Sequence, residues 1–162
     1  NINCTATGCA AFRTTTGTAS GTNAFTSNTT GNALNSAKNN TWTFTLGGSS
    51  LSSCQTFKVY FQGERTNSSS NTISLTYSLN GGTYTSTGIT ATVGTNPNIV
   101  NLTNSATWYE GLFTIPTAAD NPTTSLAFKL TIGNNGTSNV QLDNLEVQAV
   151  QQTTTYSWTG AP

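Results

Sequence analysis

Acidic side chains are the rarest reactive groups of this sequence, and acid–base chemistry depends on them because the chain contains no histidine. A serine or cysteine nucleophile needs a base such as histidine, and a glycoside hydrolase needs two facing carboxylates. No spacing along the sequence pairs the acidic residues, so the sequence predicts a protein that is not an enzyme. The acidic residues are Glu64, Glu110, Asp120, Asp143 and Glu146.

Asp143 and Asn144 interrupt an otherwise regular strand pattern over residues 140–150. The apolar residues before and after this pair alternate in opposite phases, with Leu142 in one phase and Leu145 in the other. A one-residue slip of this kind predicts a β-bulge, in which short polar side chains bind neighbouring backbone amides.

Three aromatic residues are candidate glycan contacts: Tyr60, Tyr84 and Trp108. Tyr60 and Trp108 each alternate with apolar residues, which predicts rings on the outward faces of strands. An outward ring can equally be covered by a loop or by a neighbouring subunit, so both interpretations stay open. Trp42 shares the phase of Phe44 and is predicted to lie in the core.

Charged residues make up 6% of the chain, against roughly a quarter in ordinary globular proteins. The basic residues are scattered rather than clustered, so the sequence predicts neither a nucleic acid partner nor binding to anionic membranes. No apolar run is long enough to predict a membrane-inserted segment. The polar surface is therefore expected to consist mainly of Thr, Ser and Asn side chains.

The three cysteines are Cys4, Cys9 and Cys54. They permit one disulfide and leave one thiol that is either unpaired or available to link chains. A bond from Cys54 to Cys9 or Cys4 closes a long loop and is expected to stabilise the fold more than a bond between Cys4 and Cys9. We predict the pair Cys9 and Cys54, and an oxidising, extracellular environment.

Alternating apolar and polar residues predict strands through the middle of the chain, and no amphipathic helix pattern competes with them. The clearest segments are TWTFTL, FKVYFQ, ISLTYSL and SLAFKLTI. Asn80-Gly81-Gly82 predicts a tight hairpin whose second strand is TYTSTGITATV. Together these segments predict an all-β fold, a two-sheet antiparallel β-sandwich of jelly-roll type. The predicted core residues are Trp42, Phe44, Phe57, Val59, Phe61, Leu75, Tyr77, Phe113, Leu126, Phe128, Leu130 and Leu142.

Composition divides the chain into three parts. Residues 1–40 are predicted to be a Thr-, Asn- and Gly-rich segment that contributes the first strand or strands, residues 41–150 the sandwich body, and residues 151–162 a tail or linker between modules. Low complexity normally predicts disorder, so we expect ordered ends to dock on the sandwich or on a neighbouring copy.

Two short motifs suggest a resemblance to a known family. YSLNGG (residues 77–82) matches a strand-into-turn pattern, and LDNLEV (residues 142–147) matches a final strand. Over roughly residues 10–148 the chain resembles the jelly-roll modules of secreted and cell-surface, adhesin-like proteins of Bacteroidota, which are similar in shape to carbohydrate-binding modules. The chain lacks the C-terminal sorting domain of such exported proteins, so it is expected to be a fragment or a processed subunit.

The resemblance implies a non-catalytic, extracellular structural or adhesive module of a cell-surface protein or filament. Because the chain has few charged residues to repel pairing at sheet edges, the sequence also predicts self-association with copies of itself or with adjacent modules through edge strands or termini. The alternative is a carbohydrate-binding module with a glycan as its partner. In related jelly rolls an acidic residue of the last strand helps to hold a structural calcium ion, which implies Asp143 and Asn144 as candidate ligands. Calcium takes about six to eight oxygen ligands, so a single carboxylate predicts a weak site.

Overall fold

The structure is a computed structural model that describes residues 3–7, 13–14, 32–36, 39–47, 49–65, 71–91, 96–103, 109–133 and 140–151. Two short 3-10 turns, η1 (Ser49–Ser53) and η2 (Thr117–Ala119), accompany the strands in these ranges. The strands are β1 (Asn3–Thr7), β2 (Arg13–Thr14), β3 (Asn32–Ser36), β4 (Thr41–Gly47), β5 (Cys54–Arg65), β6 (Asn71–Leu79), β7 (Thr90–Ala91), β8 (Ile99–Leu102), β9 (Tyr109–Thr114), β10 (Ser125–Ile132) and β11 (Val140–Gln151).

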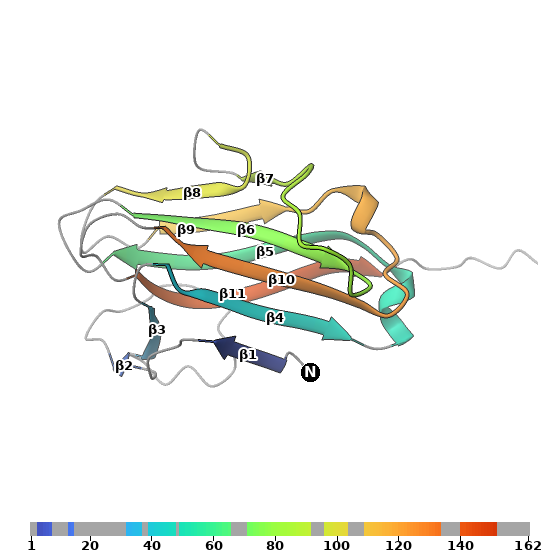
Figure 1. The fold of residues 1–162 in the computed structure, drawn as a ribbon, viewed down its shortest axis with the longest axis horizontal. Coiled ribbons are helices and arrows are strands. Elements are labelled where there is room, and N and C mark those ends of the chain that lie inside the picture. The colour runs from blue at the N-terminus through green and yellow to red at the C-terminus, as the bar shows by residue number, and fades with distance from the viewer. Residues whose placement is uncertain are drawn as a thin grey trace, which may run out of the picture.

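These strands form two antiparallel sheets, which confirms the predicted all-β sandwich. The five-stranded sheet has the order β1-β4-β10-β6-β8, and the six-stranded sheet has the order β2-β3-β11-β5-β9-β7. Figure 1 shows most strands of both sheets running roughly along the long axis of the molecule. Every pairing between strands is antiparallel in the described part of the chain.

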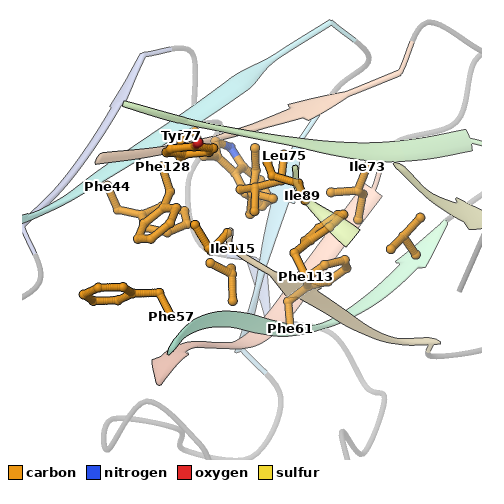
Figure 2. Packing of buried hydrophobic residues seen from close by; sticks show 14 of the residues in the cluster. Phe44, Phe57, Phe61, Ile73, Leu75, Tyr77, Ile89, Phe113, Ile115 and Phe128 are labelled. Carbon is orange, nitrogen blue, oxygen red and sulfur yellow. The ribbon is translucent and has the colours of Figure 1, made fainter. Parts of the chain in front are cut away.

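The core fills the space between the inward faces of the two sheets, and every predicted core residue is buried. The rings of Phe44 and Phe128 pack with their centroids 5.6 Å apart, and those of Phe61 and Phe113 lie 5.7 Å apart. Figure 2 shows these aromatic rings packed among aliphatic side chains. Because aromatic and aliphatic residues alternate with polar ones on each long strand, one face of each sheet is apolar.

Gly111 of β9 makes room for one of these rings. Its register partner is Phe61, and a Cβ atom on residue 111 would overlap the Phe61 ring. A glycine at this position therefore lets Phe61 lie flat against β9 and stack on Phe113.

The hairpin prediction is only half right. Asn80 and Gly81 adopt positive φ angles of 52° and 77°, and the Gly82 amide donates to the Leu79 carbonyl oxygen at 2.9 Å, as a tight turn requires. The predicted return strand is wrong over its described residues 83–91, because only Thr85 among them pairs with β6, in an isolated bridge to Tyr77.

Another positive φ angle, 77° at Gly88, ends the extended run after the turn. Ile89, the next residue, is buried in the core. The chain then crosses to the six-stranded sheet, where β7 pairs with β9. The apolar anchor and the glycine together explain why this Thr-rich segment does not continue along β6.

Strand β11 contains the predicted bulge. Its register against β5 shifts between Asp143 and Glu146, and a second shift separates Gln148 from Val150. The slip in the sequence pattern at residues 143–144 is therefore confirmed as an irregularity of strand pairing.

Other predictions concern parts of the chain that the structure describes only in part. Cys54 is half-buried at the start of β5, Cys4 lies in β1, and Cys9 falls outside the described residues, so the Cys9–Cys54 pair stays a prediction. The division at residues 40 and 150 likewise stays a prediction. No helix in the described ranges is both long and apolar enough to cross a membrane.

Candidate functional site

The outward face of the six-stranded sheet collects three of the four acidic side chains that the structure describes, and only Asp120 lies elsewhere. On β5 the residues between Phe57, Val59 and Phe61 point away from the core, because successive side chains of a strand alternate between faces. Lys58, Tyr60, Gln62 and Glu64 are therefore the outward residues of this strand.

The neighbouring strands place further polar residues beside Tyr60. On β9, Leu112 is the register partner of Tyr60 and Glu110 is the partner of Gln62. On β11, Glu146 is the partner of Tyr60. Tyr60 thus lies on the middle strand with a glutamate on each flanking strand. We call the group Tyr60, Gln62, Glu64, Glu110 and Glu146 the acidic face.

The pKa of Tyr60 reports how closely the two glutamates approach its hydroxyl. Burial raises this pKa above its ordinary value, and a hydrogen bond from the phenol to Glu110 and the charge of Glu110 raise it further. The charge of Glu146 acts in the same direction, whereas a hydrogen bond with Gln62 lowers the pKa. Both carboxylates are therefore close enough to act on the phenol oxygen.

Glu146 has one carboxylate oxygen in use and one without a partner. Its Oε1 atom accepts a hydrogen bond of 3.1 Å from Gln148 Nε2. Its Oε2 atom is buried and has no hydrogen-bond partner among the described residues. A buried polar atom normally has a partner, so a rotation of the carboxylate that exposes this oxygen would let it accept a hydrogen bond.

The acidic face also contains polar groups that are shielded from water. Gln62 is 3% exposed although it lies on the outward side of β5. Burial raises the pKa of Glu64 above its ordinary value. Carboxylates, amides and one aromatic ring thus lie on a surface that is partly desolvated.

An open depression of about 520 Å³ adjoins the acidic face along the end of β5 and β11. Thr56, Lys58 and residues 146–150 line it. Glu146 belongs to both features, so the depression continues the acidic face toward the end of β11.

The structure separates the aromatic residues that the sequence proposed as glycan contacts. Tyr84 lies over the outward side of the other sheet, where the Lys129 ammonium nitrogen is 4.1 Å from its ring centroid. Tyr60 and Tyr84 therefore belong to opposite faces of the sandwich and do not form a single site. Trp108 lies outside the described residues.

The calcium prediction remains untested. Asp143 and Asn144 form part of β11, but their side chains are outside the described structure. Among the side chains that the structure describes, no three Asp, Glu, Cys or His residues come together in a way that could hold a metal ion.

Sequence reasoning missed Glu110 and Glu146 as members of a site. The sequence shows no spacing that pairs them, since they lie on strands that are neighbours of β5 but not of each other. Alternation within each strand gave the face of each residue, and only the strand order brings the two glutamates to Tyr60. Arg65, the neighbour of Glu64 in the sequence, is 5% exposed and donates a hydrogen bond to the Thr103 carbonyl oxygen.

No protein-family model matches the sequence, and no curated protein matches it. Solved structures resemble the fold. The carbohydrate-binding module TmCBM61, solved with β-1,4-galactotriose, is 14% identical with a TM-score of 0.44, over 73% of this chain and 70% of that one. The K3 cleaved adhesin domain of Lys-gingipain from Porphyromonas gingivalis w83 is 19% identical with a TM-score of 0.40, over 76% of this chain and 77% of that one.

The enzymatically active domain of tailspike protein 4 from bacteriophage CBA120 is also similar. It is 10% identical with a TM-score of 0.50, over 93% of this chain but only 19% of the tailspike chain. At identities this low the likeness is one of fold alone, and the chemistry of the acidic face has to be argued from its own residues.

Proposed function

We propose that the chain is a non-catalytic, extracellular carbohydrate-binding module whose sugar lies on the acidic face. The observation that supports this most strongly is the position of Tyr60 between Glu110 and Glu146 on three adjacent strands. A sugar ring has an apolar face that can pack on an aromatic ring and hydroxyl groups around its edge that can bind carboxylates and amides. Tyr60 supplies the ring, and Gln62, Glu110 and Glu146 supply the polar partners.

The unpartnered Glu146 Oε2 atom supports binding at this place on the face. A buried acceptor without a donor costs free energy, and a rotation of the carboxylate would present this oxygen to a sugar hydroxyl on the face. The adjoining depression gives a chain of several sugar units room to continue past residues 146–150.

A glycan array with the wild-type protein and two variants tests the proposal. Tyr60→Ala is expected to lose binding to every glycan that the wild type retains, because it removes the stacking surface. Tyr84→Ala is the matched control, since it removes the same side chain from the outward side of the opposite sheet and is expected to bind as the wild type does. Binding that is lost in Tyr84→Ala and kept in Tyr60→Ala would place the site on the five-stranded sheet and contradict the proposal.

Self-association as a structural or adhesive module is a second candidate, and it rests on strand β11. From Leu145 to Gln151 this strand pairs with β5 on one side, and no described strand pairs with its other edge. Val150 in this segment is 61% exposed. An open edge with an exposed apolar side chain is a surface on which another strand can add by backbone hydrogen bonds.

A further inference from the structure

The charges of this chain balance overall but are unevenly placed. The sequence contains as many acidic as basic residues. Glu64, Glu110 and Glu146 nevertheless lie on one face of one sheet, and Lys58 is the only described cation that the same strands present there. Only 6% of the residues are charged, so composition alone does not predict three glutamates on one face. The strand order is what brings them together.

The two glutamates beside Tyr60 have no described counter-ion. Glu110 and Glu146 form no ion pair with a described lysine or arginine, and the Oε2 atom of Glu146 is buried without a hydrogen-bond partner. Burial raises the pKa of Glu64, because the charged form of a carboxylate loses hydration when it is shielded from water. Glu110 is exposed and Glu146 is half-buried, so both carboxylates can pair with a ligand that carries a positive charge.

An aromatic ring between two carboxylates is a suitable place for an ammonium group. The ring face attracts a cation through its quadrupole, and each carboxylate can accept a charged hydrogen bond. Tyr60 supplies the ring, while Glu110 and Glu146 act on its hydroxyl from the two flanking strands. Acidic sugars would meet the same carboxylates as like charges.

We propose that the acidic face selects glycans whose sugars carry a protonated amino group, such as oligomers of glucosamine. The inference rests on the proposed carbohydrate-binding function and adds the charge of the ligand. N-acetylation removes the positive charge of such a sugar, and a uronic acid reverses its sign. Both changes are expected to weaken binding while leaving the ring that stacks on Tyr60 in place.

Isothermal titration calorimetry with three oligosaccharides of equal length tests this selection: a glucosamine oligomer, its N-acetylated counterpart and a galacturonic acid oligomer. At a pH of about 5.5 ordinary carboxylates are ionised and the amino sugar is protonated. The glucosamine oligomer is expected to bind about fivefold to tenfold more tightly than the N-acetylated one at low salt, as for a few partly exposed ion pairs. This advantage should shrink severalfold at about 0.5 M salt because the charges are then screened.

The variants Glu110→Gln and Glu146→Gln keep the shape of each side chain and remove its charge. Each is expected to lose most of the preference for the amino sugar, so that its affinities for the glucosamine oligomer and the N-acetylated oligomer become nearly equal. Asp120→Asn is the control, since Asp120 accepts a hydrogen bond from the Thr56 amide away from Tyr60 and asparagine preserves an acceptor oxygen. Equal affinity for the three oligosaccharides would overturn the charge selection and leave the carbohydrate-binding function intact. If the protein binds none of the three oligosaccharides and no glycan on a neutral array, both the charge selection and the carbohydrate-binding function are overturned.

Discussion

Tyr60 shows how a single side chain can report the chemistry around it. Its pKa is raised first by burial and then by Glu110, so its hydroxyl is expected to ionise at a higher pH than an ordinary tyrosine. Ultraviolet titration of the wild type minus that of Tyr60→Phe isolates this group. In Glu110→Gln the same difference curve should move to lower pH, because the carboxylate that disfavours the phenolate is gone. An unchanged midpoint would show that Glu110 does not reach the Tyr60 hydroxyl.

Glu64 gives a second test at a single residue, this time through stability. Burial raises its pKa in the folded state, so the folded protein prefers the protonated form. The stability linked to this preference is fully present below the unfolded pKa of about 4.3 and is lost as pH rises through the folded pKa. Glu64→Gln mimics the protonated form and should therefore raise the Tm at neutral pH, by about 1 °C for a partly exposed group.

The pH dependence of this effect distinguishes charge from packing. At a pH of about 3.5 the wild-type carboxyl is itself protonated, so Glu64→Gln and the wild type should unfold at nearly the same temperature. Differential scanning calorimetry at the two pH values measures the difference. A gain in Tm of equal size at both pH values would show that packing or hydrogen bonding, and not charge, causes the effect.

The face of each residue was predictable from its own strand, but its neighbours were not. The alternation in FKVYFQ places Tyr60 outward, and the structure confirms this. Glu110 and Glu146 are separated from Tyr60 by about 50 and 86 positions, and nothing local indicates that β9 and β11 flank β5. Strand order depends on which faces bury the most apolar area over the whole chain, a property that no short segment contains.

At the scale of strands, the close approach of Gly111 to the Phe61 ring predicts that a larger residue at position 111 destabilises the fold. A Cβ atom at Gly111 would overlap the Phe61 ring, which is itself stacked on Phe113. Gly111→Ala is therefore expected to destabilise the fold by about 1 to 3 kcal/mol, the usual cost of overpacking. Gly47→Ala is the matched control in β4, where nothing lies within 4 Å of the added Cβ atom. Chemical denaturation of both variants measures the difference, and equal midpoints would contradict the packing argument.

Patterns of neighbouring residues predicted some elements correctly and others wrongly. The slip at Asp143-Asn144 and the turn at Asn80-Gly81 depend on neighbouring residues only, and the structure confirms both. The return strand after that turn was wrong because Ile89 has a place in the core, which the chain reaches by leaving β6 at Gly88. An interaction distant in sequence thus outweighed a propensity that favoured continued pairing.

Across the whole molecule, the two outward faces of the sandwich differ in chemistry. The five-stranded sheet presents hydroxyls such as those of Thr43, Thr76 and Thr131 around Lys129, which Tyr84 covers. The six-stranded sheet presents the acidic face and then the open edge of β11. A module of this kind can hold a ligand on one surface while its edge contacts another copy, so binding and self-association need not exclude one another.

The edge of β11 allows self-association to be tested on the intact chain. Two copies that pair their β11 edges antiparallel would join their six-stranded sheets about a two-fold axis. The edge carries few charged residues, so little electrostatic repulsion opposes this pairing. The light-scattering mass of the wild type is expected to rise toward that of a dimer with concentration. Val150→Lys adds a charge at the exposed edge position and should hold the protein monomeric. Ser86→Lys, at an exposed position outside the strands, adds the same charge as a control and should still dimerise. A wild type that stays monomeric at every concentration, or a Ser86→Lys variant that dissociates as Val150→Lys does, would contradict pairing through this edge.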